Sequence, residues 1–242
     1  MQDFGMSTMV IVPTYDEAEN IAAIAAAVRS HGFGLLVVDD GSPDGTGDIA
    51  DRLAAADEGI HVLHRAEKSG LGPAYAAGFA RALDLGAEII CEMDADFSHD
   101  PNDLPRLVGA VRNGADLAIG SRYVQGGGTR GWAWHRRLLS QMGNLYARMM
   151  LGLRVRDATA GFRAFRDTTI RKLEPSSCEA SGYGFQIEMA WRTERAGLTV
   201  VEVPIVFSER VAGSSKMDGR IALEAIRLVT RWGVARLFGR RR

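Results

Sequence analysis

The stretch ICEMDADFSHDPND, residues Ile90–Asp103, is the most informative part of the sequence, because an apolar run ends there in a cluster of carboxylates. Asp94 and Asp96 follow the run with one alanine between them. Alternate side chains of an extended chain point to the same side, so both carboxylates should face one way. Two adjacent carboxylates repel each other unless a cation lies between them. A lone Asp-x-Asp triplet is more often a capped turn, but its place at the end of a buried strand favours a divalent metal site.

Short apolar runs alternate with helical patterns around this stretch. Strands are predicted at residues 8–15, 34–42, 60–65 and 87–96, and helices at 20–32, 48–56 and 73–86. This alternation predicts an α/β fold with a mostly parallel sheet flanked by helices. Ligands of such sheets bind beyond the carboxyl ends of the strands. Three polar clusters are expected at that edge, namely PTYDEAEN from Pro13, DDGSPDGTG from Asp39 and DADFSHD from Asp94.

Length and composition are those of one globular domain with a small appendage. The chain has 242 residues, of which 46% are hydrophobic, so it can bury a substantial core. No glycine-rich dinucleotide fingerprint and no phosphate-binding lysine loop follows the first strand, which disfavours a dehydrogenase and a P-loop nucleotide hydrolase. Only Cys91 and Cys178 are present, and no apolar run approaches the length of a spanning helix. We therefore expect a cytoplasmic protein without a disulfide framework.

The net charge of −1 hides an uneven distribution. From Gly219 onward the chain carries seven arginines and one acid, so this tail has a charge of +6. We expect a catalytic domain over residues 1–217 and a basic amphipathic C-terminal helix and tail over 218–242. The polar stripe of that helix is Arg220, Glu224, Arg227 and Arg231, and the opposite, apolar face is Ile221, Ala225, Leu228 and Trp232. Either this apolar face lies in a membrane interface, or it packs against the domain.

Eight motifs that occur in order resemble the polyprenol-phosphate (dolichol-phosphate) mannose synthases of glycosyltransferase family 2. They are VPTYDEAENI, VVDDGSPDGT, KSGLGPAYAAGF, DADFSHDP, GSRYVQGG, DATAGFRAF, GYGFQIEM and EVPIVFSERVAGSSKM, and they cover almost the whole chain. The resemblance implies a GT-A fold and an inverting transfer of mannose from GDP-mannose to a polyprenyl monophosphate. It implies no affinity for nucleic acid. It also implies an enzyme at the cytoplasmic face of a membrane, which either binds the membrane surface peripherally or recruits a separate membrane-spanning subunit.

The resemblance assigns a nucleotide pocket and a metal site residue by residue. The nucleotide pocket would comprise Pro13, Tyr15, Glu17, Val38, Asp39, Asp40, Lys68, Gly70, Leu71, Asp94 and Ala95. Asp39 would contact the base or the ribose. Asp94, Asp96 and Ser98 would hold Mg²⁺ or Mn²⁺, and the metal would hold the diphosphate of the donor. Mg²⁺ is often bound by such an incomplete protein shell, completed by water and substrate phosphates.

The same resemblance assigns the acceptor side. Arg122, Arg136, Ser140 and Arg210 match positions that bind the acceptor phosphate, and Lys216 is a further candidate. Asp96, Arg122 and Arg136 form the predicted catalytic set. A planar guanidinium suits a phosphate, although a solvated surface position is the commoner role for any one arginine. A phosphomonoester is largely dianionic at neutral pH, so the site needs positive charge more than a general base.

Two segments leave roles open. The family often has serine at the position of Ala160 and glutamine at that of Ser98, so a polar contact at Ala160 is in doubt. In the same segment as Ala160, Asp157 and Arg163 could form a structural ion pair or contact the substrate.

The second of these segments, GYGFQIEMAWRTERAG over residues 182–197, predicts an amphipathic helix beneath the active site. Most of its apolar residues are expected in the core. Gln186 and Glu188 match a family motif, and their catalytic value stays open.

Two other functions fit parts of the pattern. The same fold could transfer glucose from UDP-glucose to a lipid phosphate, although related enzymes usually add membrane helices. A catalytically idle nucleotide-sugar-binding or membrane-adaptor module would lack charge in the acceptor loop. This loop retains Arg122, Arg130, Arg136 and Arg137.

Overall fold

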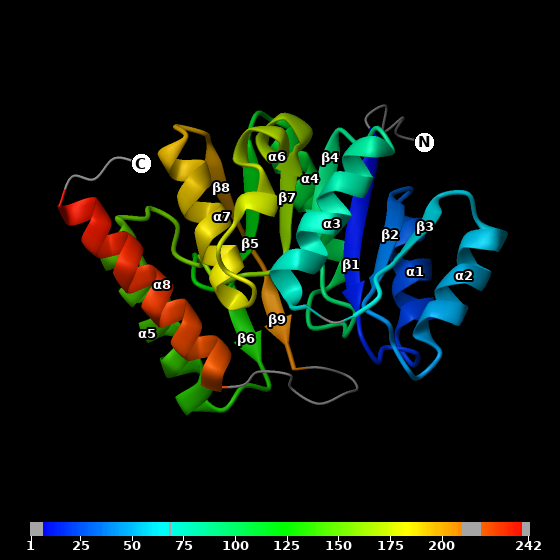
Figure 1. The fold of residues 1–242 in the computed structure, drawn as a ribbon, viewed down its shortest axis with the longest axis horizontal. Helices are drawn as coiled ribbons and strands as arrows, with labels where there is room; N and C mark the ends of the chain where they lie inside the picture. Colours follow the sequence, from blue (N-terminus) through cyan, green and yellow to red (C-terminus); the bar gives the residue numbers. More distant parts are fainter. Residues whose placement is uncertain (1–6, 68, 210–218, 239–242) are drawn as a thin grey trace.

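The computed structural model describes residues 7–67, 69–209 and 219–238. Its centre is a seven-stranded sheet with the strand order β3-β2-β1-β4-β7-β5-β8. The strands are β1 (Thr8–Thr14), β2 (Gly34–Asp39), β3 (Ile60–His64), β4 (Ile89–Glu92), β5 (Leu117–Ser121), β7 (Arg163–Arg166) and β8 (Val200–Pro204). All neighbours are parallel except β7, which is antiparallel to both β4 and β5. Figure 1 shows β3 and β8 at opposite ends of the sheet.

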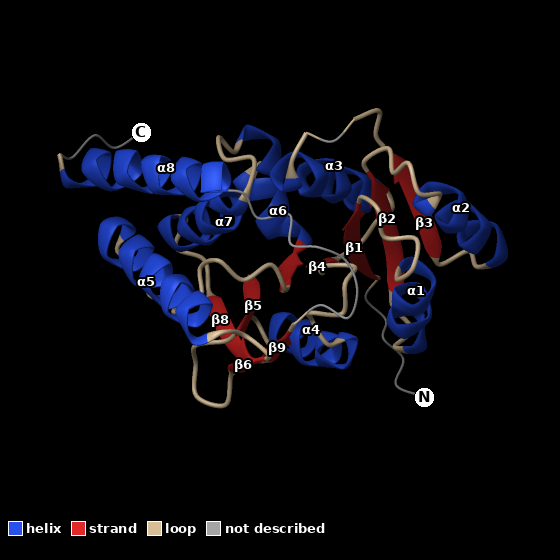
Figure 2. Ribbon diagram, turned by 90° about the horizontal axis from the view of Figure 1, so that it is seen from below, coloured by secondary structure: helices blue, strands red, loops and turns tan. Residues whose placement is uncertain are grey.

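Helices cover both faces of the sheet, as the view in Figure 2 shows. One face packs against α1 (Ile21–Ser30), α2 (Thr46–Ala56) and α4 (Leu104–Arg112). The other face packs against α3 (Leu71–Asp84), α5 (Trp134–Leu151), α6 (Asp167–Leu173), α7 (Tyr183–Arg195) and α8 (Gly219–Leu237). Two short 3-10 helices, η1 (Pro101–Asp103) and η2 (Pro175–Ser177), lie before α4 and after α6.

The fold expected for the first half of the chain is confirmed. The four predicted strands and three predicted helices occur in order, with ends that differ by a few residues. In β1, Val10 and Val12 belong to one hydrophobic cluster, whereas Met9 and Ile11 belong to the other. A strand that is buried on both faces has a continuous apolar sequence, which is why these strands could be predicted from their apolar runs.

The strand before the paired aspartates is shorter than expected. β4 ends at Glu92, so Asp94 and Asp96 lie in a turn and the expected extended geometry is wrong. Within this turn the backbone of Phe97 adopts a φ of 58°, in the left-handed region. The two carboxylates therefore differ in exposure, since 34% of the Asp94 side chain is exposed while Asp96 is only 3% exposed.

The second half of the sheet contains a strand that the sequence analysis missed. β7 is four residues long and carries arginine at both ends, so it has no apolar run. β7 lies between β4 and β5, both of which run in the direction opposite to its own. Arg163 pairs with Glu92 of β4 on one side and with Ile119 of β5 on the other. Because β7 is antiparallel, the loop that precedes it lies at the carboxyl edge of its neighbours. Residues 157–162 therefore reach the edge at which ligand sites are expected.

A second, two-stranded sheet is formed by β6 (Gly128–Arg130) and β9 (Val206–Ser208), which are parallel. The amide of Ser208 donates a hydrogen bond of 3.0 Å to the main-chain carbonyl of Ser98. This contact ties the small sheet to the turn that contains Asp96.

The C-terminal helix α8 packs against the domain through the face that was expected to be apolar. Leu228 and Trp232 contact the core, and the indole of Trp232 stacks on that of Trp191 with 5.5 Å between ring centroids. Arg231 forms an ion pair with Glu179. Of the two alternatives for this face, packing against the domain is confirmed for Leu228 and Trp232. The side chains of Arg220 and Ile221 lie outside the described part of the structure.

Residues 7–67, 69–209 and 219–238 contain no helix that combines the length and the hydropathy needed to cross a membrane.

Gly78 of α3 lies so close to β1 that a methyl group does not fit. An added Cβ would lie 2.7 Å from Cγ2 of Ile11 and 3.2 Å from Cγ2 of Val38. We predict that Gly78→Ala lowers the free energy of unfolding by about 1–3 kcal/mol, because overpacking a filled core forces its neighbours to shift. Gly109→Ala on α4 is the control, since nothing lies within 4 Å of its added Cβ. It should stabilise the protein by roughly 0.5–1 kcal/mol. Urea unfolding measures both effects, and equal stabilities would contradict the close contact.

Candidate active site

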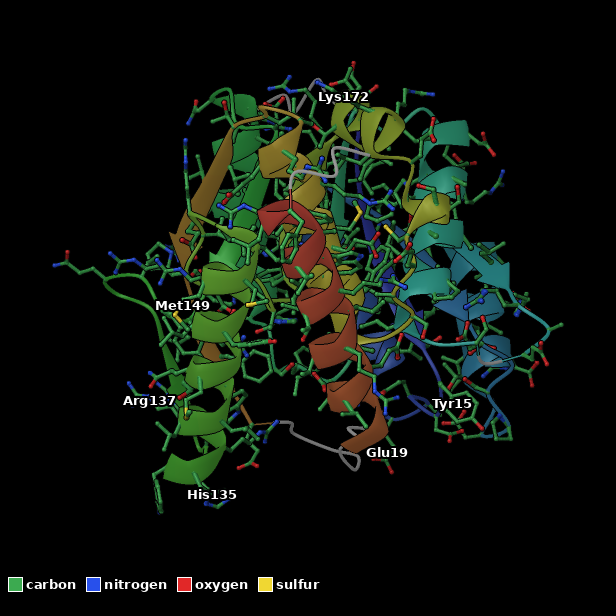
Figure 3. All side chains as sticks on the ribbon, turned by 60° about the vertical axis from the view of Figure 1, so that its left-hand side comes forward. Tyr15, Glu19, His135, Arg137, Met149 and Lys172 are labelled. Atoms are coloured by element: carbon green, nitrogen blue, oxygen red, sulfur yellow. The ribbon has the colours of Figure 1, made fainter. Side chains whose placement is uncertain are left out.

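The carboxyl ends of β1, β2, β4 and β5 meet along one edge of the sheet. The register of β1 and β2 places Thr14 beside Asp39. Arg122 follows the last residue of β5 at the same edge. Figure 3 shows Tyr15, which follows β1, at this edge and Lys172 at the opposite end of the molecule. The polar clusters predicted to converge at the strand ends are therefore brought together.

Asp39 organises the turn after β2. Its carboxylate accepts hydrogen bonds from the hydroxyl of Thr14 at 3.1 Å, from the hydroxyl of Ser42 at 2.5 Å and from the amide of Ser42 at 3.2 Å. The Asp39 side chain is buried. It thus joins the ends of β1 and β2, and its contact with a base or ribose stays a prediction.

Asp44 holds the next part of this loop. Its carboxylate accepts hydrogen bonds from the amide of Ala18 at 2.9 Å, from the amide of Thr46 at 3.0 Å and from the hydroxyl of Thr46 at 2.5 Å. Burial acts to raise the pKa of Asp44, but these hydrogen bonds outweigh burial and lower the pKa below its ordinary value. The hydroxyl of Thr46 in turn accepts from the amide of Glu17 at 3.0 Å. The loops after β1 and β2 are therefore fastened to each other.

The other residues predicted for the nucleotide pocket differ in their surroundings. Those that are half-buried at this edge are Pro13, Tyr15, Glu17, Gly70 and Leu71. Val38 is fully buried in the core between β1 and β3, so its side chain is not available to a ligand. Asp40 forms an ion pair of 2.6 Å with Arg65, a partner that the sequence analysis missed. Ala95 is buried, and Lys68 lies outside the described residues.

The turn after β4 presents oxygen atoms from three side chains. The carboxylate of Asp94 is partly exposed, whereas that of Asp96 is buried and accepts a hydrogen bond of 3.0 Å from the amide of Ser98. The hydroxyl of Ser98 is buried and has no hydrogen-bond partner in the described structure. A buried hydroxyl without a partner costs free energy that a ligand can recover. Carboxylate and hydroxyl oxygens are suitable ligands for Mg²⁺ or Mn²⁺, so this donor set fits such an ion.

The described residues include no group of three or more histidine, cysteine, aspartate or glutamate side chains that could hold a metal ion. The turn after β4 thus offers part of a coordination shell.

His99 is buried against this turn in its neutral form. Burial lowers the pKa of His99 to about 4, although the charge of Asp96 acts to raise it. The ring stacks on Phe162 with 4.9 Å between centroids and lies edge-on to Phe207 at 5.1 Å. Nδ1 of His99 lies 3.8 Å from the carboxylate of Asp94. Because the imidazole is neutral at pH 7, it does not neutralise that carboxylate.

A buried polar layer lies beneath the turn, and the sequence analysis missed it. Burial raises the pKa of Glu92 to about 7, while the charge of Arg163 and the side chain of Gln186 act to lower it. Burial lowers the pKa of Arg163 to about 10, although the charge of Glu92 acts to raise it. Arg163 donates hydrogen bonds of 2.8 Å to the carbonyls of Ala158 and Ala160. This arginine therefore supports the loop before β7 from within the core.

Arg122 and Asp157 form a buried ion pair where the acceptor phosphate was predicted to bind. The guanidinium donates to both carboxylate oxygens, at 2.8 and 2.6 Å, and the amide of Arg122 donates to the same group at 2.9 Å. The alternative in which Asp157 pairs with Arg163 is wrong for this reason. Arg122 also donates to the hydroxyl of Thr159 at 2.8 Å, which accepts a second bond of 2.9 Å from Asn144 of α5. Arg122 is thus fixed between β5, the loop before β7 and α5.

The ring of Trp132 brings two predicted acceptor residues together. The guanidinium carbon of Arg136 lies 4.2 Å from its centroid, and that of Arg122 lies 5.5 Å from the same ring. Arg136 also lies 3.6 Å from the exposed carboxylate of Glu209. No role for Trp132 was predicted from the sequence, although an aromatic ring among arginines is a usual sign of cation–π contact.

Ser140 is joined to this group through a tyrosine. The hydroxyl of Tyr123 donates a hydrogen bond of 2.7 Å to the hydroxyl of Ser140, and the guanidinium of Arg122 lies 5.2 Å from the Tyr123 ring. The structure therefore brings Arg122, Arg136 and Ser140 to one place. Arg210 and Lys216 lie outside the described residues.

Glu188 on α7 has a structural part. Its carboxylate accepts hydrogen bonds from the amides of Glu179 and Ala180 at 3.0 and 3.1 Å and forms an ion pair of 2.6 Å with Arg192. These contacts fix the segment that enters α7. Residues Phe185, Ile187 and Met189 of the same helix are buried, which confirms the expected core helix.

The mostly parallel sheet and its flanking helices have the GT-A fold of solved glycosyltransferase structures. Glucosyl-3-phosphoglycerate synthase from Mycobacterium tuberculosis, in complex with UDP, matches 95% of this chain and 81% of its own length with a TM-score of 0.70 and 22% identity. Mannosyl-3-phosphoglycerate synthase from Rubrobacter xylanophilus matches 100% and 77% with a TM-score of 0.69 and 19% identity. Another structure of the first enzyme, which contains Mn²⁺, UDP and glucosyl-3-phosphoglycerate, has a TM-score of 0.64.

The chain belongs to glycosyl transferase family 2, whose profile matches residues 9–173. It is 51% identical to the polyprenol monophosphomannose synthase of Mycolicibacterium smegmatis, over 94% of this chain and 87% of that protein. It is also 51% identical to the undecaprenyl-phosphate mannosyltransferase of Micrococcus luteus, over 95% of each chain. The dolichol-phosphate mannosyltransferase of Pyrococcus furiosus is 35% identical over 93% of this chain and 63% of that protein.

Burial of Glu92 predicts a pH-dependent contribution to stability. Folding raises its pKa from 4.5 to about 7, so stability is lost as the pH rises from about 4.5 through about 7. Glutamine has a similar shape and does not ionise. We predict that Glu92→Gln gains stability relative to the wild type across this interval and that the difference levels off above it. Thermal unfolding of both proteins at a series of pH values measures the effect, and parallel curves would contradict it.

Proposed function

We propose that this protein transfers mannose from GDP-mannose to the phosphate of a polyprenyl monophosphate and so makes a lipid-linked mannose donor. The observation that carries the proposal is similarity over nearly the whole chain to two proteins that are half identical to it. One is called a polyprenol monophosphomannose synthase and the other an undecaprenyl-phosphate mannosyltransferase. A third relative, about one-third identical, is called a dolichol-phosphate mannosyltransferase. All three names combine mannose with a polyprenol-type phosphate.

The donor would lie beyond β1, β2 and β4. Asp94, Asp96 and Ser98 would hold Mg²⁺ or Mn²⁺, which when bound would stabilise the negative charge that develops on the departing nucleoside diphosphate. The partly exposed carboxylate of Asp94 and the unpartnered hydroxyl of Ser98 support this assignment. Asp39 holds the floor of the base and ribose pocket in place through its hydrogen bonds to the turn after β2.

The acceptor phosphate would lie beyond β5, next to Arg122 and Arg136. A phosphate oxygen attacks the anomeric carbon of mannose, and the bond from that carbon to the donor diphosphate breaks with inversion. The nucleophile is largely dianionic at neutral pH, so no proton has to be removed from it. Asp157 neutralises part of the charge of Arg122, which lets the guanidinium hold the phosphate without suppressing its nucleophilicity.

Ser140 can donate a hydrogen bond to the same phosphate. Its oxygen already accepts a hydrogen bond from Tyr123, so its own proton remains available for donation. Tyr123 is therefore a positioning residue for Ser140.

An exposed apolar stripe along α5 supports docking at the surface of a membrane. Its side chains are exposed by 47 to 76%, and they are Trp134, Leu138, Leu139, Met142, Leu145 and Met149. α8 lies beside α5 in Figure 3 and adds Leu223, Ile226, Val234 and Leu237, and Phe238 follows directly after it. Exposed apolar side chains that are clustered on neighbouring amphipathic helices are typical of a membrane interface. This face, which we name the α5/α8 apolar face, would rest on the cytoplasmic leaflet.

Transfer of radiolabelled mannose from GDP-mannose to a short polyprenyl phosphate tests the proposed function. We expect labelling to require Mg²⁺ or Mn²⁺ and to stop on addition of EDTA. Asp94→Asn and Asp96→Asn should each lower turnover by roughly 100-fold or more, because the leaving charge loses its stabilisation. Asp84→Asn, at the far end of α3, makes the same change of charge and should keep wild-type turnover.

Other outcomes of this assay count against parts of the proposal. Labelling from UDP-glucose alone would replace mannose by glucose. Metal-independent labelling would refute the metal site. No labelling from either donor, with donor binding intact, would indicate an idle module or the need for a separate membrane-spanning subunit.

The α5/α8 apolar face predicts a measurable affinity for lipid vesicles. Replacing Leu139 and Met142 together by glutamine should lower the fraction that floats with vesicles by tenfold or more, since each buried apolar side chain contributes roughly 1.5–3 kcal/mol. The double replacement of Val201 and Val206, which are exposed on β8 and β9, is the control and should float like the wild type. A wild-type chain that does not float would refute direct docking and favour recruitment by a membrane subunit.

A further inference from the structure

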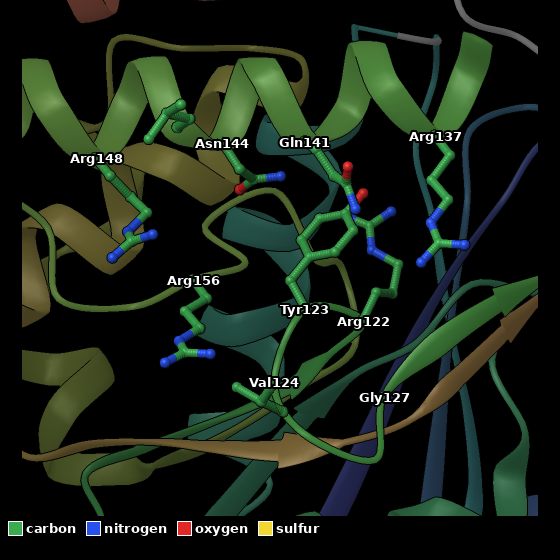
Figure 4. A pocket seen from close by; sticks show the side chains of 10 residues that line it. Arg122, Tyr123, Val124, Gly127, Arg137, Gln141, Asn144, Arg148 and Arg156 are labelled. Carbon is green, nitrogen blue, oxygen red and sulfur yellow. The ribbon is translucent and has the colours of Figure 1, made fainter. Parts of the chain in front are cut away.

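A cavity of about 480 Å³ lies between α5 and the segments that follow β5 and precede β7. Four arginines line it, and we name it the arginine pocket; they are Arg122, Arg137, Arg148 and Arg156. None of its other lining residues is charged. In Figure 4, Arg148 and Arg156 lie at one end of the cavity, and Arg122 and Arg137 lie towards the other.

Three of these arginines have no acidic partner among the described residues. Arg122 pairs with Asp157, but Arg137, Arg148 and Arg156 form no ion pair there. The Nε atom of Arg148 is buried and has no hydrogen-bond partner. Burying a charged donor without a partner costs free energy, and cations that share a cavity repel one another. The pocket is therefore complementary to an anion.

The loop that carries Arg156 is held rigidly by two carboxylates. Glu202 of β8 accepts hydrogen bonds from the amides of Arg156 and Asp157 at 2.8 and 3.0 Å. Glu194 of α7 accepts a hydrogen bond of 3.0 Å from the amide of Arg154. Both carboxylates accept hydrogen bonds from main-chain amides of this loop. The backbone from which the guanidinium of Arg156 reaches the pocket is therefore fixed.

The pocket borders the α5/α8 apolar face. Leu145 lines the pocket, is 51% exposed and belongs to the apolar stripe of α5. A ligand that fills the pocket would therefore have an anionic group next to an apolar one. Lipids with a phosphate headgroup have this combination, whereas free phosphate does not.

The far end of the pocket is separate from the acceptor residues. Arg148 lies eight residues beyond Ser140 on the same helix, which is about 12 Å along the helix axis. The ring of Tyr123 lines the pocket near Arg122, at the end closer to the acceptor site. A phosphate between Arg148 and Arg156 would thus be a second one, in addition to that of the acceptor.

We propose that Arg148 and Arg156 bind the headgroup phosphate of an anionic bilayer phospholipid that is not consumed in the reaction. This lipid fixes α5 on the membrane beside the acceptor. The inference rests on the proposed function, because it takes the α5/α8 apolar face to lie on a membrane.

Flotation of the full chain tests the proposal with vesicles of phosphatidylcholine, alone or mixed with phosphatidylglycerol. We expect Arg148→Gln and Arg156→Gln each to lower the affinity for mixed vesicles by more than tenfold and to leave binding to phosphatidylcholine unchanged. Arg154→Gln is the matched control, as it removes one charge from the same loop outside the pocket. It should lower the affinity by about fivefold or less, which is what one basic residue adds through the surface potential.

Three results would overturn the proposal. Equal losses in all three variants would indicate general attraction to a charged surface. If inorganic phosphate raised the thermal midpoint of the wild type but not of Arg148→Gln, with no preference for phosphatidylglycerol, the occupant would be a free anion. A raised KM of Arg148→Gln for the polyprenyl phosphate, with vesicle binding unchanged, would assign the pocket to the acceptor.

Transfer in detergent without phospholipid separates this proposal from the proposed function. Arg148→Gln should keep the wild-type rate there. A wild type that transfers no mannose would refute the proposed function, while vesicle binding would still decide the role of the pocket. Because the side chain of Arg156 is exposed, its replacement should leave the thermal midpoint unchanged and so excludes a folding defect.

Discussion

The buried ion pair between Arg122 and Asp157 is the contact on which the arrangement of the segments after β5 and before β7 depends. It joins the end of β5 to the loop before β7, and Thr159 extends it to α5. Removing one partner of a buried pair leaves the other charge unpaired, which typically costs about 3–5 kcal/mol. The loop that this pair fixes also reaches the turn after β4, since a Cβ added to Gly161 would lie 4.0 Å from a carboxylate oxygen of Asp94. The ion pair therefore fixes a loop that lies next to both the predicted metal ligands and Arg122.

The sequence predicted the fold best where each strand is buried on both faces and forms a continuous apolar run. β1, β2 and β4 are of this kind, and the helices between them have regular apolar stripes. β7 could not be found in this way, because its position depends on main-chain pairing with two neighbours and its own sequence is RAFR. The turn after β4 was also misjudged, because nothing in the apolar run showed that the strand ends at Glu92 before the aspartates.

The resemblance predicted side chains for the site but not their partners. Arg122 and Arg136 lie together as expected, yet the ring of Trp132 between them and the pairing of Arg122 with Asp157 depend on contacts between distant segments. The buried charge of Glu92 was missed because it ends an apolar strand, and that of Arg163 was missed because β7 itself was not predicted. The apolar stripe of α5 could have been predicted from the sequence, since most of its residues recur every three or four positions. The prediction for that segment rested only on its arginines.

β7 also acts as a spacer. Neighbouring strands lie about 4.8 Å apart, so the ends of β4 and β5 are separated by about 10 Å with β7 between them. If β4 and β5 were adjacent, a diphosphate beyond one and a phosphate beyond the other would lie half as far apart, with no room for a hexose ring. The span across which a sugar would pass is therefore set by a ladder of main-chain hydrogen bonds. Substitutions in the flanking loops can alter which acceptor is held, but they leave this span unchanged.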